Sequence, residues 1–407
     1  MKKFLNLICI FTMLGTVKSQ TDFQITDSTL YLKAIQLSKD FLIVDTHIDL
    51  PSWLYNEWFD VSVQTDMGEF DYQRAINGGL DVAFMSIYTS PSLEGRGKSK
   101  EKADSMIALV HKMIDEWPDK FSFIKSPSEI TEQANKGKIL LTMGMENGSP
   151  IKNNLQNIAE FYDKGVRYIT LAHYKWNHIC DSANDPERKW NGLSPFGEEV
   201  IKEMNRLGII IDVSHISDST FYDVIKLSKA PVIASHSSCR YFIPGLERNM
   251  SDDLIKTLAE NDGVIQINFA NIFLRKEIHK QMEDGDAEIK NYIEHNNINP
   301  DSHEAREYSR KFIKEHPLPK ATVKDAADHI DHVVKLVGVN HVGLGSDFNG
   351  VGEGNLPIGL EDVSKYPNLI YELLVRGYRD EDIKKILGEN LLHVWKQVEA
   401  IAESSKN

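Results

Sequence analysis

Eight apolar runs alternate with helical segments along the chain, and this alternation constrains the fold more than any other feature. Each run is short and bounded by polar residues, as expected for a buried strand. Strands that alternate with helices form parallel sheets whose two faces are both covered. The runs are Phe41–Val44, Leu80–Tyr88, Lys138–Met145, Arg167–Ala172, Ile209–Val213, Pro231–Ser235, Gly263–Phe269 and His341–Ser346. Helices are expected near 27–39, 101–116, 154–164, 196–207, 218–228, 251–261 and 322–337.

Eight such units in one chain of 407 residues favour a (β/α)8 TIM barrel over an open doubly wound sheet. No glycine-rich phosphate motif follows the first run, which further disfavours a dinucleotide-binding fold. A ninth short run, Phe121–Ile124, is expected to be an excursion from this order. Residues 52–78 are expected to form a long loop, and 361–401 to form two or three amphipathic helices outside the barrel.

The charged segment 275–320 interrupts the order of strands and helices. It is too long for a simple connection, so we expect an insertion that holds helices over the barrel mouth. Two hypotheses fit this segment equally well from sequence. One is a lid over an active site, and the other is a solvated surface insertion.

The first residues carry the pattern of a secretory signal peptide. Two lysines precede the apolar segment Phe4–Leu14, and Val17 and Ser19 suit a cleavage site after Ser19. We therefore expect residues 1–19 to be removed, and residues 20–407 to form one catalytic barrel that is periplasmic or secreted. About a dozen apolar residues are too few to span a bilayer, so no membrane anchor is expected.

The charge and the cysteines narrow the function further. A net charge of −14 disfavours nucleic acid or an anionic membrane as a partner. Outside the predicted signal peptide the chain keeps Cys180 and Cys239. An oxidising compartment permits a disulfide between them, but the sequence does not imply one.

Polar residues follow most of the apolar runs, at the ends where barrel enzymes place their active sites. His47 and Asp49 follow the first run, and their spacing of two puts both side chains on one side of an extended backbone. Later runs end in further histidines and carboxylates. These are Glu146, His173, His215, His236 and Asp347.

Four histidines and three carboxylates placed in this way predict a metal site. Imidazole with carboxylate suits Zn²⁺ or Mn²⁺, and this many ligands favours two ions that share one carboxylate. Glu146 is the candidate bridge, with His47 and Asp49 on one ion and His215 and His236 on the other. Two ions about 3.5–4 Å apart can hold a hydroxide between them as a nucleophile at neutral pH.

A second cluster, Asp328–His332, also has two histidines at a helical spacing. Such a spacing occurs in metal motifs. The cluster lies inside the expected helix 322–337, outside the barrel, and we therefore predict that it is structural.

The segments around the predicted ligands resemble the membrane dipeptidase (renal dipeptidase) family of zinc peptidases, peptidase family M19. The resemblance spans about 41–400 and keeps the order of the family's motifs. The matching segments are Val44–Pro51, Gly144–Gly148, Leu171–Tyr174, Ile211–His215, Pro231–Ser238, Arg248–Met250, Val342–Phe348 and Gly359–Pro367.

The resemblance implies a barrel of the metal-dependent hydrolase type that hydrolyses dipeptides with two zinc ions per subunit. It implies that the metal ligands are His47, Asp49, Glu146, His215 and His236, with Glu146 bridging. It also implies a homodimer and tolerance of a C-terminal D-residue in the dipeptide.

Three further roles follow from the resemblance. His173 would contact the substrate and stabilise the oxyanion. Arg248 would hold the C-terminal carboxylate of the dipeptide, an anion that suits a guanidinium fork. Asp347 would move the proton, first helping the attack by water and then protonating the leaving amine.

Three positions depart from the family pattern, and none of them is a ligand position. Asn147 stands where glycine is common, Ser149 where some members have histidine, and Asn349 where an aspartate is frequent. They bear on substrate preference more than on the class of reaction.

Two other functions are compatible with a barrel of this kind. A metal-dependent hydrolase of lactones, phosphoesters or N-acyl amines on the same barrel would often use a second histidine after the first strand and a carboxylated lysine as a bridge. Here Asp49 and Glu146 take those places, which disfavours it. A secreted binding protein without activity would be expected to have lost a ligand or Asp347, and none is missing.

Overall fold

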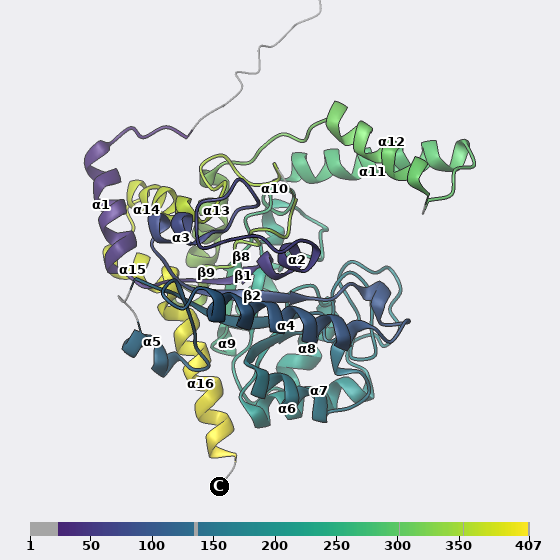
Figure 1. Cartoon of the computed structure of the whole chain (residues 1–407), viewed down its shortest axis with the longest axis horizontal. Coiled ribbons are helices and arrows are strands. Elements are labelled where there is room, and N and C mark those ends of the chain that lie inside the picture. The colour runs from purple at the N-terminus through teal and green to yellow at the C-terminus, as the bar shows by residue number, and fades with distance from the viewer. Residues whose placement is uncertain (1–22, 134–136, 301, 353, 406–407) are drawn as a thin grey trace, which may run out of the picture.

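The parallel barrel predicted from the sequence is confirmed (Figure 1). The computed structural model describes residues 23–133, 137–300, 302–352 and 354–405, and the predicted signal peptide lies outside them. Eight parallel strands follow one another in the order β1-β2-β4-β5-β6-β7-β8-β9. Their bounds are β1 (Ile43–Ile48), β2 (Leu80–Tyr88), β4 (Ile139–Glu146), β5 (Val166–Thr170), β6 (Ile210–Asp212), β7 (Ile233–Ser237), β8 (Val264–Ile267) and β9 (Val342–Leu344).

The barrel closes between its first strand and the segment that follows its last. Ile48 and Phe348 form a parallel bridge. The Asp347 amide donates to the His47 carbonyl oxygen at 3.1 Å, and the Asp49 amide donates to the Phe348 carbonyl oxygen at 2.8 Å. This seam brings Asp347 beside His47 and Asp49, although the two segments are far apart in the sequence.

Helices surround the barrel near the predicted positions, and several begin at serine caps. Ser194, Ser217 and Ser251 each accept a hydrogen bond from the amide three residues later, which satisfies a free N–H of the first turn. The helices are α1 (Ser28–Asp40), α4 (Ser99–Glu116), α6 (Gln156–Lys164), α7 (Pro195–Leu207), α8 (Asp218–Leu227), α9 (Asp252–Glu260) and α13 (Val323–Val337). The C-terminal segment forms α14 (Tyr366–Val375), α15 (Asp380–Lys384), a π turn (Lys385–Glu389) and α16 (Asn390–Ser404).

The expected long loop 52–78 was wrong in part, because it carries two short helices. Helix α2 (Leu50–Asn56) begins just before this region and continues into it, with Pro51 in its first turn, a position that suits proline. Helix α3 (Tyr72–Gly78) is capped by Asp71, whose carboxylate accepts from the Arg74 amide at 2.8 Å. Both helices are only two turns long, too short to show a clear hydrophobic period.

The remaining short elements follow the chain between these larger ones. The ninth run, Phe121–Ile124, forms β3 (Phe121–Phe123), which pairs with β4 outside the closed path, as expected for an excursion. The other helices are α5 (Pro127–Gln133), α10 (Asn271–Leu274), α11 (Lys276–His295) and α12 (His303–Glu315). Single 3-10 turns lie at Pro91–Leu93, Ser149–Ile151, Arg240–Phe242, Val339–His341 and Val363–Lys365.

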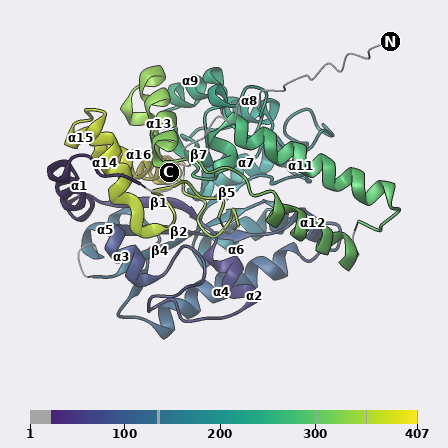
Figure 2. The same cartoon turned by 90° about the horizontal axis from the view of Figure 1, so that it is seen from above.

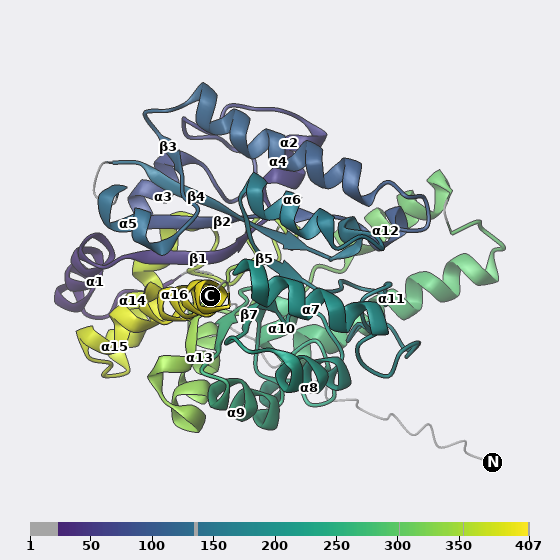
Figure 3. The same cartoon turned by 90° about the horizontal axis from the view of Figure 1, so that it is seen from below.

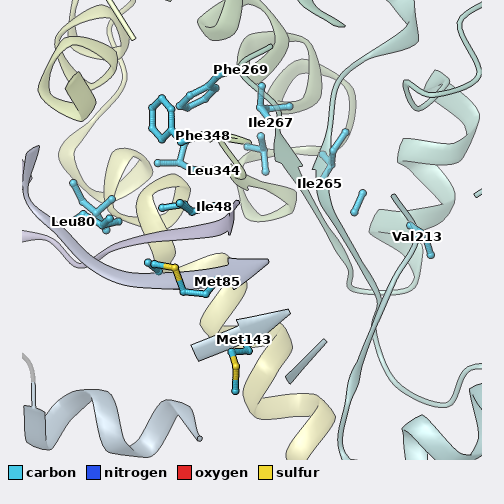
Figure 4. Packing of buried hydrophobic residues seen from close by; sticks show 14 of the residues in the cluster. Ile48, Leu80, Met85, Met143, Val213, Ile265, Ile267, Phe269, Leu344 and Phe348 are labelled. Atoms are coloured by element: carbon cyan, nitrogen blue, oxygen red, sulfur yellow. The ribbon is translucent and has the colours of Figure 1, made fainter. Parts of the chain in front are cut away.

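Apolar side chains fill two separate spaces. Outside the strands, a large cluster packs between the sheet and the helices, and Figure 4 shows part of it from close by. Inside, side chains from the strands meet the C-terminal helix, which closes one end of the barrel (Figure 3). The rings of Phe84 and Trp395, for example, lie 5.3 Å apart. The opposite end of the barrel, where the strands finish, stays polar.

The insertion between β8 and β9 holds helices, as predicted. Helices α11 and α12 form a hairpin that projects from the barrel (Figures 1 and 2). The stacked rings of Tyr292 and Tyr308, with centroids 3.6 Å apart, join the two helices. Whether this hairpin acts as a lid stays a prediction. Every helix in the described part of the chain is too short or too polar to traverse a lipid bilayer.

Candidate active site

The histidines predicted as ligands gather around one carboxylate, that of Glu146 at the end of β4. Its Oε1 atom lies 3.1 Å from the Nε2 atom of His215 and 3.4 Å from that of His236. The Nε2 atom of His173 is 3.3 Å from the same oxygen. Across the carboxylate, Oε2 lies 3.5 Å from the Nε2 atom of His47. All of these side chains are buried, with at most 7% of their residue surface exposed.

Asp49 and Asp347 complete the cluster on the side of the barrel seam. The Nε2 atom of His47 is 3.3 Å from the Oδ2 atom of Asp49. Three overlapping groups of donor atoms each lie within 4.8 Å of one another. The groups are His47 with Glu146 and His236, Glu146 with His173 and His215, and His47 with Asp49 and Asp347. The structure thus brings together every predicted ligand, as well as His173 and Asp347.

The donor atoms are arranged to bind divalent cations and not to hydrogen-bond to one another. The Nε2 atoms of His215 and His236 are only 2.9 Å apart, so at most one of them can donate a proton to the other. The Nε2 atom of His47 is buried and has no hydrogen-bond partner among the described residues. Imidazole nitrogens and carboxylate oxygens crowded in this way are the ligand set of Zn²⁺ or Mn²⁺ sites.

Electrostatics favour an ionised bridge. Burial alone would raise the pKa of Glu146, but the imidazoles of His173 and His47 and the hydrogen bonds from His215 and His236 outweigh it. The pKa of this carboxyl is therefore held well below its ordinary value. A carboxylate at the centre of the cluster is the form that can bind cations on both oxygens.

Two of the site residues adopt backbone conformations that are unusual for their side chains. The φ angles of His215 and Asp347 are +67° and +65°, in the left-handed region. Such conformations cost free energy and persist where the surrounding structure holds them. Here the Ala183 amide donates to the His215 carbonyl oxygen at 2.7 Å, and the barrel seam holds Asp347. Both side chains are thereby turned into the mouth of the barrel.

A tyrosine that sequence reasoning did not single out orients His47. The hydroxyl of Tyr168 lies 2.9 Å from the carbonyl oxygen of Thr46 and 2.7 Å from Nδ1 of His47. Because a carbonyl oxygen can only accept, both contacts are satisfied only when the hydroxyl donates to Thr46 and accepts from Nδ1–H. Nε2 of His47 then carries a lone pair toward the carboxylates. Gly144 makes room for this ring, since a Cβ there would lie 1.8 Å from the tyrosine.

A similar chain of hydrogen bonds fixes His236. The Ser235 hydroxyl donates to the Asp212 carboxylate at 2.6 Å and lies 2.7 Å from Nδ1 of His236. Because the serine hydroxyl donates its proton to the carboxylate, the Nδ1–H of the imidazole must donate to the serine oxygen. The hydroxyl of Thr170 donates to the same oxygen of Asp212, and the hydrogen bonds described for His236 do not include it. Asp212, Ser235 and Thr170 are all fully buried.

Arg248 is a buried cation at the edge of the cluster, with 2% of its surface exposed. It donates to the Ser237 hydroxyl at 2.9 Å and to the His236 carbonyl oxygen at 2.7 Å. Its Nε–H has no partner among the described residues, and no carboxylate pairs with the guanidinium there. Burial lowers its pKa without removing the charge. Such a group can receive an anion.

The carboxyl group of Asp347 is buried and accepts a hydrogen bond from one neighbouring side chain. The Asn268 amide donates to its Oδ2 atom at 2.8 Å. Burial, reinforced by the charges of Asp49 and Glu146, raises the pKa of Asp347 to about 8 against an ordinary value of 3.8. A carboxyl that can hold or release a proton near neutral pH suits a role in proton transfer.

These groups line one cavity of about 340 Å³ at the mouth of the barrel. Glu146, His173, His215, Arg248 and Asp347 all contribute to its wall. The volume is sufficient for a small peptide. Among the described residues, no lysine contributes to the wall of this cavity.

The comparisons with known proteins agree with this arrangement. The sequence model of the membrane dipeptidase family (peptidase family M19) matches residues 32–407. The chain belongs to this family. Membership of this family indicates that the cluster described above is the site of a metal-dependent hydrolase.

Relatives of this dipeptidase span nearly the same length. An uncharacterized dipeptidase of Schizosaccharomyces pombe is 33% identical over 392 residues, which cover 90% of this chain and 83% of that protein. The crystal structure of the probable dipeptidase PvdM from Pseudomonas aeruginosa is 26% identical, with a TM-score of 0.78 over 92% of this chain and 99% of the other. A metallo peptidase from Rhodobacter sphaeroides, liganded with a phosphinate mimic of the dipeptide L-Ala-D-Ala, shares the fold at 22% identity. Its TM-score is 0.72, over 88% of this chain and 99% of that one.

Two other predictions concern residues away from the dipeptidase site. The helical histidine His329 is buried and structural, since its Nδ1 atom accepts from the Cys239 amide at 2.9 Å. His332 pairs instead with Asp252 at 2.7 Å. Cys180 and Cys239 are both buried free thiols in the structure.

Proposed function

We propose that this protein is an exported dipeptidase that depends on two zinc ions, or on Mn²⁺ or a similar ion in their place. The observation that carries the proposal is one cavity that holds both a metal-type donor cluster and a buried Arg248, whose Nε–H has no partner among the described residues. A dipeptide has the matching parts, namely a carbonyl to be polarised and a free carboxylate two bonds beyond the amide. Family membership supports the class of reaction.

The ligands would be His47, Asp49, Glu146, His215 and His236, with Glu146 between the two ions. When bound, the ions would supply an activated water and would polarise the scissile carbonyl. Tyr168 and Ser235 would keep the Nε2 lone pairs of His47 and His236 directed at the ions, because each hydroxyl fixes the tautomer of its histidine.

The other residues would act on the substrate. The guanidinium of Arg248 would hold the C-terminal carboxylate by charge-assisted hydrogen bonds. His173 would donate to the oxygen that gains charge in the transition state. Asp347 would take a proton from the attacking water and return it to the leaving amine, consistent with its raised pKa.

Export is the second part of the proposal. The basic and apolar pattern of residues 1–19 supports it. The protein would then act outside the cytoplasm, in the periplasm or as a secreted enzyme, as a monomer or a homodimer.

The deciding experiment is release of free amino acid from dipeptides by purified residues 20–407. The panel would contain L-Ala-L-Ala, Gly-D-Ala and L-Ala-D-Ala, the last because the related bacterial peptidase holds a mimic of it. We expect hydrolysis that a chelator abolishes and added zinc restores. The control variant is Asp347→Asn, which keeps every proposed ligand and should retain zinc but lose activity. Failure of the zinc-loaded protein to cleave any dipeptide would refute the proposal.

The described residues offer no support for the alternative hypothesis of a metal-dependent hydrolase with a carboxylated lysine. A bridge made of carboxylated lysine needs a lysine at the site, and the described wall of the cavity has none. Lactones, phosphoesters and N-acyl amines belong in the same assay as negative controls.

A further inference from the structure

One carboxyl group behind the site joins the two edges of the barrel seam. Asp45, on β1, is fully buried, and its Oδ1 atom accepts from the His47 amide at 3.0 Å and from the Ser346 amide at 3.1 Å. His47 belongs to the first strand, whereas Ser346 follows the last strand and precedes Asp347. A single oxygen atom thus holds the backbones of both segments that meet at the seam.

The other oxygen of this carboxyl group is held by the C-terminal part of the chain. The Tyr366 hydroxyl donates to Oδ2 of Asp45 at 2.5 Å, and the tyrosine is only 1% exposed. The Tyr366 ring also packs edge-on against the ring of Phe348, with centroids 6.1 Å apart. Phe348 forms the bridge to Ile48 that closes the barrel, so the tyrosine contacts both the carboxyl group and the seam.

The segment Gly359–Pro367 places this tyrosine. It is one of the segments that resemble the dipeptidase family, although it contains no predicted ligand. Within it, the Asp362 carboxylate accepts from the Ser364 amide at 2.8 Å and caps a single 3-10 turn. Helix α14 follows directly, with Tyr366 as its first residue. The local fold of this segment therefore brings one hydroxyl group to Asp45.

Asp45 is not itself part of the metal-type cluster. Among the described residues, none of the three groups of donor atoms includes it. Both of its oxygen atoms already accept hydrogen bonds from the protein, two from backbone amides and one from a phenol. Burial of a carboxyl group costs free energy, and these donors offset that cost. Such a group fixes its neighbours and has no free oxygen for a cation.

We propose that Asp45 and Tyr366 are positioning residues that set the distance between His47, a proposed metal ligand, and Asp347, the proposed proton-transfer residue. Asp45 holds the amide of His47 and the amide of the residue before Asp347. The Tyr366 hydroxyl keeps the carboxyl group in the orientation that reaches both amides. This inference rests on the proposed dipeptidase function and extends it by giving the C-terminal segment a role in the site.

The test compares two hydrogen bonds from a phenol to a carboxylate, one behind the site and one away from it. Tyr366→Phe removes the first. The matched control, Tyr378→Phe, removes a hydroxyl that donates to Asp331 of α13 at 2.8 Å on the outside of the barrel. Zinc binding to purified residues 20–407 is measured in competition with a chelator, and kcat/KM is measured for L-Ala-L-Ala.

We expect Tyr366→Phe to weaken the binding of one zinc ion by about 10- to 100-fold, the usual effect of removing a group that orients a ligand. The ion affected should be the one that His47 would bind, and the other should change less than about threefold. The value of kcat/KM should fall over the same range. Tyr378→Phe should change zinc binding and kcat/KM by less than about threefold.

Substitutions of Asp45 give an independent readout. Asp45→Asn keeps an oxygen that can accept from both amides, whereas Asp45→Ala leaves no acceptor there. The asparagine variant should therefore hold the affected zinc ion about tenfold more tightly than the alanine variant. If Asp45→Ala does not fold, the comparison of Tyr366→Phe with Tyr378→Phe still decides the role.

The possible results separate this inference from the proposed function. If the unsubstituted protein binds zinc but cleaves no dipeptide, the proposed function fails, and the zinc measurements still test the positioning role. If that protein is active and Tyr366→Phe lowers only the melting temperature, without changing zinc binding or kcat/KM, the positioning role alone is refuted. Equal weakening of zinc binding in Tyr366→Phe and Tyr378→Phe would also refute it, because the loss would then come from general destabilisation.

Discussion

Arg248 allows the proposed orientation of the substrate to be tested quantitatively. The guanidinium is fully charged, 2% exposed and without a carboxylate partner in the described chain. Replacing it with methionine, Arg248→Met, keeps an unbranched side chain of similar reach and removes the charge. If Nε–H and one further N–H hold the substrate carboxylate, two charge-assisted hydrogen bonds of about 1.5–3 kcal/mol each are lost.

Part of that free energy is returned, because water can solvate the carboxylate in the complex that the variant forms. We therefore expect a loss of about 2–4 kcal/mol, or roughly 30- to 1000-fold in kcat/KM. The assay measures kcat/KM for L-Ala-L-Ala and for its C-terminal amide, on the unsubstituted protein and on the variant. The amide lacks the anion, so the substitution should cost it less than about threefold.

A similar loss for both compounds would refute the orientation, because it would mean that the arginine acts on something other than the substrate carboxylate. Folding provides a separate control. A buried cation without a carboxylate partner in the described chain costs stability, so Arg248→Met should melt at the same temperature as the unsubstituted protein or higher. A marked fall in melting temperature would show that Arg248 is instead a structural residue.

Three other predictions address the metal site and the scaffold. Ser235→Ala should weaken zinc binding by about 10- to 100-fold in competition with a chelator, because the histidine behind it loses its fixed tautomer. Thr170→Val deletes another hydrogen bond to the same carboxylate oxygen and should weaken zinc binding less than about threefold; equal effects would contradict the role of the serine. Burial raises the pKa of Asp81 to about 6 from 3.8, so the charged form of this carboxyl destabilises the fold. Asp81→Asn should therefore raise the free energy of unfolding above pH 6 by about 1–3 kcal/mol. Chemical denaturation should show this gain fading as pH falls from 6 to below 4, where the carboxyl is protonated in both states, and a gain that persists at low pH would rule out the charge. Zinc at about one hundred times its dissociation constant should stabilise the chelated protein by about 2.7 kcal/mol, visible as a higher melting temperature that calcium does not reproduce.

Much of the fold could be predicted, because the strands of a covered parallel barrel are apolar on both faces. The run Leu80–Tyr88 was predicted with the bounds that β2 has in the structure. The helices α2 and α3 were missed, since seven residues each carry too little periodicity to reveal a helix. Strand ends were predicted less well, because polar residues such as Asp45 and His47 continue β1 beyond the predicted apolar run Phe41–Val44.

The candidate site could be predicted in its chemistry but not in its supporting contacts. His47 and Glu146 stand out because charged groups follow apolar runs. Tyr168 does not, because a tyrosine within a strand looks like any other core residue, and only the structure shows its hydroxyl on His47. Asn349 was noticed in the sequence, but its unpaired amide depends on three-dimensional neighbours.

The closing seam has a consequence for how the molecule can assemble. Asp347 reaches His47 only when the last strand meets the first, and α16 fills the end of the barrel only after that strand has been made. The part of the cluster that contains Asp347 therefore cannot form until the last strand has been synthesised. Contacts between such distant parts of a sequence slow folding, because a long loop must be closed before they form. For the proposed export, such a delay would help to keep the chain unfolded until it has crossed the membrane.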